Sequence, residues 1–460
     1  MGLLGIVVFV ALGWALSRNR KAIHWPTIGW ALGLQWLIAL VVLRGAALAN
    51  GLGFLPWPRH GGWLVLALLA GALLLRRQSR PGPRRLAWVL AGLAGLGALR
   101  GNLVAGAFEQ ARGLVQHLMG YASEGATFIF GPLADPMGAP VRGSSGSLGM
   151  VFAFVVLPTI IFMASLFAVL YHLGVMPRVV DLLARIFRRF LRLSGAESLS
   201  VAASIFLGQT EAPLTIRPFL ARLTRSELML VMTAGMAHVS GAIMVAYVQV
   251  ARVDIVHLLT AVLMTAPGAV LMAKLLEPET EVPETASHTR PESASNDANL
   301  LDAAVRGASE GMQLAINVAA MLIAIIALVA LVNGCLRAIH PGLTLEWLLS
   351  LVFRPFALLM GVPWPDSGAV AALLGKRTVV NEFVAYIGLG QDPALGVKAR
   401  LIATFALCGF ANFSSIAIQV GGIGALVPER RHDLARLGLR AMLAGTLANF
   451  LSACIAGLLV

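Results

Sequence analysis

The sequence contains little charge and little cysteine for a chain of 460 residues. Only 12% of the residues are charged and 58% are hydrophobic, which excludes an ordinary water-soluble domain. Cys335, Cys408 and Cys454 are scattered and form no C-x-x-C pair, so neither a disulfide framework nor a zinc site is supported. The apolar segments do not alternate with polar residues at a period of two, which excludes a membrane β-barrel.

What the chain has instead is a series of long apolar runs. A run of about 20 residues is the length at which a helix crosses the hydrocarbon core of a bilayer. The pattern therefore predicts an all-α polytopic membrane protein with about ten transmembrane helices. The predicted spans are 3–17, 27–48, 58–76, 85–100, 148–172, 227–249, 254–276, 312–338, 396–422 and 438–459.

The basic residues predict how these spans are oriented. The formal net charge is +13, but the Lys and Arg residues lie in short loops beside apolar runs and form no basic patch interleaved with aromatics. They act as topology signals, and nucleic acid is not an expected partner. If the four clusters are cytoplasmic, ten spans place both termini on the periplasmic side. The expected location is the cytoplasmic (inner) membrane of a bacterium. The clusters are 18–21, 76–85, 178–192 and 430–440.

Two other segments differ from the spans. In 176–193, apolar residues recur at helical spacing with arginines among them, which predicts a helix lying in the membrane interface. An ordinary amphipathic loop helix is the alternative. Residues 277–299 are rich in Pro, Glu and Ser and predict a solvated, disordered cytoplasmic linker between two halves of similar content.

Each half contains a stretch too polar and too broken to cross the membrane simply. These stretches are 196–221 and 345–389, and each resembles two half-helices that meet at a polar tip, a re-entrant hairpin. Each is followed by a span with a polar interruption, at 233–243 and at 406–418, and then by one more span. Because the first hairpin would be cytoplasmic and the second periplasmic, the pattern predicts an inverted-repeat transporter with its site between the repeats.

The polar residues of these broken stretches are the candidate site. Glu211 and Glu382 lie in apolar surroundings, where a carboxylate is costly and usually faces a solute, an ion or a charged partner. Salt bridges to Arg217 or Arg377 are the structural alternative. Gln209 and Thr210 in the first half, and Asn412, Ser414 and Ser415 in the second, offer hydrogen bonds to a small uncharged solute. Ser414 by itself is better explained as interhelical polar contact.

Two further residues have open interpretations. Phe410 could stack on a planar ligand, although a lone Phe in a span is usually packing. His238 is the histidine in the core of a span, where it is either hydrogen-bonded structure or part of ion coupling.

Six motifs give the sequence a clear resemblance to the concentrative nucleoside transporter family. They are GQTEAPL (208–214), RSELMLVMTAGM (225–236), GASEGMQLAINVAAMLIA (307–324), GKRTVVNEFVAY (375–386), LCGFANFSSIAIQVGGIG (407–424) and PERRHDLARLG (428–438). The resemblance covers nearly everything from about residue 100 to the end. It implies a homotrimer that imports nucleosides such as uridine, cytidine or adenosine on a sodium or proton gradient, without a cofactor.

The resemblance also assigns contacts. Family contacts to the base fall on Gln209, Thr210, Glu211 and Ile243. Family contacts to the ribose fall on Glu382, Asn412 and Ser415, and Phe410 matches an aromatic at the substrate.

The chain departs from the sodium-coupled members in two of the cation-site residues. Ser204 replaces an asparagine, and His238 replaces a small hydroxyl residue, while backbone carbonyls at Leu207 and Val239 would complete the site. Losing an amide oxygen weakens a sodium site, and His238, Glu211 or Glu382 could carry a proton. The sequence therefore favours proton coupling, with a degenerate sodium site as the alternative. A second departure is an extra hydrophobic hairpin, with spans 58–76 and 85–100, which has no counterpart in the shorter bacterial members.

The predicted organisation follows from these assignments. A secondary active symporter explains the pattern best, ahead of a passive nucleoside or small-solute channel, because polarity is concentrated in two broken regions. An intramembrane hydrolase is the third hypothesis, but no H-E-x-x-H, G-x-S-x-G or aspartate pair occurs in the spans. The predicted units are N-terminal membrane helices with the extra hairpin (1–100), scaffold and interfacial helices (101–195), a first transport repeat (196–276), the linker (277–299), a scaffold helix (300–340) and a second transport repeat (341–460).

Overall fold

The computed structural model describes residues 1–51, 90, 93–94, 103–135, 151–285 and 297–460. Within these ranges the regular structure is entirely helical. The α-helices are α1 (Gly2–Ala15), α2 (Trp25–Leu43), α3 (Gly45–Gly51), α6 (Leu103–Phe130), α7 (Phe152–His172), α8 (Val175–Leu191), α9 (Gly195–Ser204), α10 (Arg225–Ala237), α11 (Gly241–Ala251), α12 (Ile255–Leu276), α13 (Leu300–Ile339), α14 (Leu345–Leu359), α15 (Ser367–Val379), α16 (Glu382–Gln391), α17 (Val397–Leu407), α18 (Phe413–Leu426) and α19 (Arg431–Leu459). Short 3₁₀ segments are η1 (Arg20–Ala22), η2 (Gly131–Ala134), η3 (Ala212–Arg222), η4 (Trp364–Asp366) and η5 (Pro428–Arg430).

Six helical segments in the described part are long and apolar enough to cross a membrane. Together with the relatives reported below, they make this a multi-pass membrane protein. The six are Trp25–Leu43, Phe152–His172, Arg225–Ala251, Ile255–Leu276, Leu300–Ile339 and Pro428–Leu459. The predicted spans 58–76 and 85–100 fall almost wholly outside the described residues, so the count of about ten stays a prediction.

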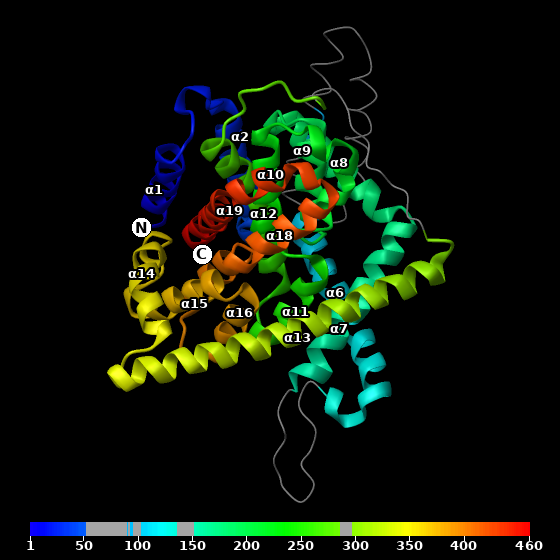
Figure 1. Cartoon of the computed structure of the whole chain (residues 1–460), viewed down its shortest axis with the longest axis vertical. Helices are drawn as coiled ribbons and strands as arrows, with labels where there is room; N and C mark the ends of the chain where they lie inside the picture. The colour runs from blue at the N-terminus through cyan, green and yellow to red at the C-terminus, as the bar shows by residue number, and fades with distance from the viewer. Residues whose placement is uncertain (52–89, 91–92, 95–102, 136–150, 286–296) are drawn as a thin grey trace, which may run out of the picture.

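The centre of the molecule is built from α10, α12 and α19, which pack against one another (Figure 1). From Ser226 to Ala237, every residue of α10 is buried. Small residues allow this close packing: a Cβ added to Gly445 of α19 would lie 3.2 Å from the backbone nitrogen of Ala237. Small residues at helix contacts are typical of membrane bundles, where close backbone approach supplies the packing energy.

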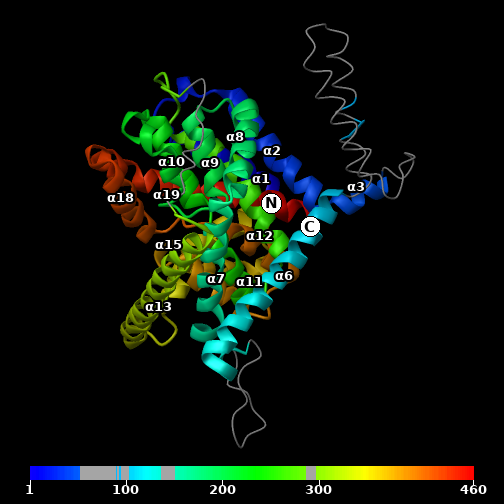
Figure 2. The ribbon, with the colours of Figure 1, turned by 90° about the vertical axis from the view of Figure 1, so that its right-hand side faces the viewer.

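Other helices surround this centre. The long α13 runs along one side of the molecule from α7 to α14 (Figure 1). It lies tightly on α7, because a Cβ on Gly307 would be 2.6 Å from the Ala168 side chain. On another side α2, α3 and α6 follow one another (Figure 2). The 28-residue α6 was not predicted as a separate element, since its polar positions hide it from a search for apolar spans.

The predicted interruptions are present. A helical path breaks between α10 and α11 at residues 238–240, and again between α17 and α18 at residues 408–412. In the first half, α9 is followed by the proline-containing η3. In the second half, 345–389 forms three helices rather than two, because α14 precedes the pair α15 and α16 that turns at Val380 and Asn381.

The segment at 176–193 is the helix α8, as predicted. It has a buried face at Met176, Val180, Ala184, Phe187 and Leu191, an exposed apolar stripe at Val175, Val179, Leu182, Ile186 and Phe190, and arginines beside that stripe. Its Phe190 ring lies 5.6 Å from the ring of Trp30 on α2.

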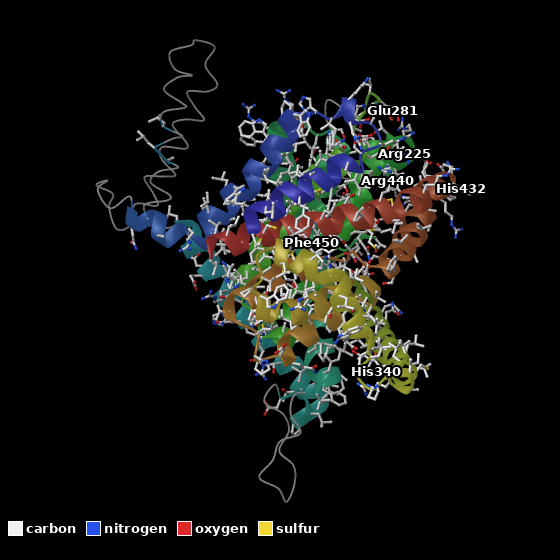
Figure 3. The ribbon with its side chains drawn as sticks, turned by 90° about the vertical axis from the view of Figure 1, so that its left-hand side faces the viewer. Arg225, Glu281, His340, His432, Arg440 and Phe450 are labelled. Carbon is white, nitrogen blue, oxygen red and sulfur yellow. The ribbon has the colours of Figure 1, made fainter. Side chains whose placement is uncertain are left out.

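The prediction of a disordered linker is wrong for residues 277–285, whose two ends pack on the protein while 280–282 and 284 stay exposed. Glu277 is buried and accepts hydrogen bonds from Arg18 and Arg225, each at 2.9 Å. The carbonyl of Thr285 accepts from the Gly195 amide at the start of α9, at 2.8 Å. The carboxylates of residues 277–285 look solvated in the sequence because their arginine partners lie far away along the chain. Arg225, Arg440 and Glu281 lie at one end of the molecule, away from His340 (Figure 3). Residues 286–296 lie outside the described part.

Candidate functional site

Glu382 is the centre of the second broken region. It is the first residue of α16 and is only 5% exposed. Its Oε1 accepts a hydrogen bond from the Tyr247 hydroxyl at 3.0 Å, and its Oε2 accepts one from the Asn412 side-chain amide at 3.0 Å. In the described part of the chain, neither Glu382 nor Glu211 forms a salt bridge to Arg217 or Arg377. Salt bridges to Arg217 or Arg377, the structural alternative for the two glutamates, are therefore absent among the described residues.

Asn412 is held by the helix that it begins. It is the N-cap of α18, and its side-chain oxygen accepts from the Ser415 amide at 2.9 Å, which satisfies one of the free donors at a helix N-terminus. The Ser414 hydroxyl donates to the same oxygen at 2.7 Å. This arrangement leaves the Asn412 amide group directed at Glu382.

Gln209 connects the first broken region to the second. Its side-chain amide donates to the Ser415 hydroxyl at 3.1 Å, although the two residues are 206 positions apart. The result is a continuous series of contacts from Gln209 through Ser415 and Asn412 to Glu382 and Tyr247. The two halves of the chain thus bring their polar side chains to one buried place.

The other predicted contact residues belong to the same stretches of chain as the side chains of this series. Ile243, in the first turn of α11, and Phe410, in the break between α17 and α18, are buried. Thr210 approaches α18 so closely that a Cβ on Gly422 would lie 2.6 Å from its methyl carbon. Glu211 is exposed, and its carboxylate accepts from the Gly208 amide at 3.1 Å.

The predicted cation residues are also neighbours. The Gly241 amide donates to the Phe206 carbonyl at 3.0 Å, which places the end of α9, with Ser204 and Leu207, beside residues 238–241. The Ser204 hydroxyl donates to the Ser200 carbonyl at 2.9 Å, and His238 Nδ1 lies 2.8 Å from the Ala234 carbonyl. Val239 is buried between His238 and Ser240. Among the described residues, no group of three His, Cys, Asp or Glu side chains could hold a metal ion.

Three residues of this region were missed as site residues. Tyr247 on α11 holds Glu382, and Asn449 on α19 donates to the carbonyls of Ala237 and Cys408 at 2.9 and 2.8 Å. Arg377 was considered only as a salt-bridge partner, but it donates to the Gly409 carbonyl at 3.3 Å. The signal that could have found Asn449 was a single amide side chain inside the apolar span 438–459.

Comparison with known proteins identifies the family. Residues 4–56 match the family model described as Na+ dependent nucleoside transporter N-terminus, and residues 257–457 match the corresponding C-terminus model. Residues 153–252 match a model described as nucleoside recognition.

Individual relatives agree with the family models. An uncharacterized transporter of Haemophilus influenzae is 39% identical over 100% of this chain and 97% of its own length. The nucleoside permease NupC of Helicobacter pylori is 40% identical over 75% of this chain and 84% of its own. The solved structure of CNTnw in an inward-facing substrate-bound state superposes with a TM-score of 0.80 at 37% identity, covering 100% of this chain and 98% of that one. The chain belongs to the concentrative nucleoside transporter family, and it is a transporter, not an enzyme.

Proposed function

We propose that this protein imports nucleosides across the cytoplasmic membrane of a bacterium by cation symport with alternating access. The observation that carries the proposal is the continuous series of hydrogen bonds from Gln209 to Glu382 and Tyr247, which joins side chains of both broken regions. Many transporters that work by alternating access form their substrate site from broken helices of two repeats.

The chemistry of the series fits a nucleoside. The Glu382 carboxylate and the Asn412 amide can bond ribose hydroxyls, with Ser415 beside them. The buried Gln209 Oε1 has no hydrogen-bond partner among the described residues, so a donor on a nucleobase edge would satisfy it. Thr210, Glu211 and Ile243 complete the contacts to the base in this proposal. Phe410, close to Asn412, supplies the aromatic face.

Proton coupling is the form of symport that we propose. A hard cation such as sodium needs several oxygen ligands, and here Ser204 offers only a hydroxyl already donating to Ser200. His238 adds a nitrogen instead of an oxygen, with Leu207 and Val239 left to contribute carbonyls. A proton can be carried by His238, Glu211 or Glu382. The Na+ dependent description of the family models keeps sodium as the alternative.

The arrangement in the membrane is also proposed. We infer that the α9–η3 and α15–α16 segments are re-entrant hairpins, since such backbone is tolerated at membrane depth only when buried in protein or lining a cavity. Both termini would be periplasmic, and α8 would lie in the interface with its apolar stripe in lipid. Exposed apolar residues along α13, such as Ile316, Ile323 and Leu331, are consistent with contact to lipid or to other copies in a homotrimer.

Uptake of labelled uridine into liposomes containing the purified protein tests this function. An importer concentrates uridine when a gradient is imposed, whereas a passive channel only equilibrates it. With sodium replaced by choline, we expect uptake to persist and to fall when the pH gradient is collapsed. Complete dependence on sodium would reject proton coupling. The Glu382→Gln protein should not accumulate uridine, and uptake close to the unaltered protein would reject its ribose contact.

A further inference from the structure

Arg377 is a fully buried cation that forms no salt bridge within the described part of the chain, although Glu382 lies near enough to act on its charge. The side chain is 0% exposed, and burying a charge is costly unless polar groups compensate it. Its Nε donates to the Gly409 carbonyl at 3.3 Å, and its Nη2 donates to the side-chain oxygen of Asn449. Besides Glu382, the compensation comes from the Gly409 carbonyl, which follows the end of α17, and from an amide side chain on α19.

Two broken helices end at this point. Ala237 is the last residue of α10, and Cys408 directly follows α17. The last carbonyls of a helix have no partner in the helix, and they carry the partial negative charge of its dipole. Asn449 donates to both Ala237 and Cys408, and Arg377 supplies the positive charge that two converging helix C-termini favour.

The two breaks are in direct contact here. A Cβ on Gly409 would lie 2.5 Å from the Ala237 carbonyl oxygen and 2.6 Å from the Asn449 side-chain oxygen, so only glycine fits. The backbone of one break is thus fixed against the backbone of the other, with Asn449 of α19 between them.

Each segment held at this point carries a residue of the proposed site a few positions later. Ala237 precedes His238, Gly409 precedes Phe410 and Asn412, and Arg377 precedes Glu382. We propose that Arg377 and Asn449 form a positioning pair, which holds Glu382 and Asn412 in the geometry that recognises the ribose. This role rests on the proposed function. Neither residue needs to touch the nucleoside.

The shape of arginine matters to this role. Its planar fork contacts Gly409 and Asn449 at the same time, whereas a lysine is a point charge that keeps the cation but not both contacts. Arg377→Lys should therefore fold and yet place Glu382 less accurately.

The test measures ribose recognition in liposomes containing the full-length protein. Inhibition of labelled uridine uptake is compared for unlabelled uridine and 3′-deoxyuridine, and the ratio of the two inhibition constants reports the contact to the hydroxyl. For Arg377→Lys and for Asn449→Ser, we expect this ratio to fall by about tenfold or more toward one, the scale of a lost hydrogen bond to a charged group. A purely structural role would lower the maximal rate and leave the ratio unchanged.

Two matched variants serve as controls. Lys376→Gln changes the adjacent residue of α15, which pairs with Glu346 at 3.5 Å, and Ser452→Ala changes α19 where it donates to the Ala448 carbonyl. Both should keep the ratio of the unaltered protein.

Glu382→Gln separates the two ideas. Because this variant is not expected to take up uridine, its ratio, like that of the unaltered protein, is measured by competition of unlabelled uridine and 3′-deoxyuridine against labelled uridine bound to the purified protein. If Glu382→Gln loses discrimination and the Arg377 and Asn449 variants keep it, the positioning pair is rejected and the ribose contact stands. If Glu382→Gln itself keeps discrimination, the proposed ribose contact is rejected. Failure of both Arg377→Lys and Asn449→Ser to fold would also overturn the inference, because it would assign the pair to the folding core.

Discussion

Tyr247 and Tyr386 provide a matched pair for testing the site. Their rings are stacked with centroids 4.4 Å apart, and both side chains are 0% exposed. Only their hydroxyls differ in role: Tyr247 donates to Glu382 at 3.0 Å, whereas Tyr386 donates to the Thr404 carbonyl at 2.8 Å. Changing each to phenylalanine removes one oxygen and leaves the stacked rings in place.

The size of the effect follows from the contacts of Glu382. Its carboxylate receives two side-chain hydrogen bonds, from Tyr247 and from Asn412, in a buried position. A hydrogen bond to a charged group contributes about 1.5–3 kcal/mol, and a neutral one about 0.5–1.5 kcal/mol. If the whole free energy of the hydrogen bond from Tyr247 to Glu382 is lost from nucleoside binding, Tyr247→Phe raises the KM for uridine roughly 10- to 150-fold.

Tyr386→Phe should affect stability more than binding. It loses a neutral bond to the backbone and none to the carboxylate, so we expect a lower melting temperature and a KM within about threefold of the unaltered protein. Initial rates of uridine uptake in liposomes, over a range of uridine concentrations, measure both variants. Equal KM values for Tyr247→Phe and Tyr386→Phe would refute the reasoning, since they would show that the Tyr247 hydroxyl does not support the nucleoside contact.

Two further predictions concern packing and the ordered part of the linker. Gly409→Ala should cost about 1–3 kcal/mol through overpacking and abolish uptake, whereas Gly421→Ala, where a Cβ meets nothing within 4 Å, should leave both thermal stability and uptake unchanged. Glu277→Gln should lower stability by about 1–3 kcal/mol in thermal melts in detergent, because a buried carboxylate with three arginine neighbours loses its charge. The exposed Glu281→Gln is its control, and equal melting temperatures for the two variants would contradict the role given to residue 277.

Much of the candidate site could be predicted from polar residues in apolar surroundings. Gln209, Asn412, Ser415 and Glu382 were selected because burying such groups is costly, and the structure brings these four together. The positions of the interruptions were predicted for the same reason, since glycine and polar residues weaken a helix locally. These features depend on the residue and its near neighbours.

Partners far along the chain could not be predicted in this way. Tyr247 looked like an ordinary apolar-span residue, yet it donates to Glu382, 135 positions away. Glu277 looked solvated, yet Arg18, in the loop after α1, and Arg225, at the start of α10, pair with it. Which donor meets which acceptor depends on how the helices pack, and hydropathy contains no information about that.

The sequence by itself determined three things: that this protein is a membrane protein, at which residues its helices break, and which buried polar side chains require a functional or structural explanation. Hydropathy and the cost of burying a polar group are properties of single residues and short windows, so they can be read in order along the chain. Only the tertiary structure decided that Gln209 meets Ser415 and that two helix ends meet at Asn449. The two helix ends meet because α10 and α17 both pack on α19, and Gln209 meets Ser415 because η3 packs on α18. Both are properties of the assembled bundle.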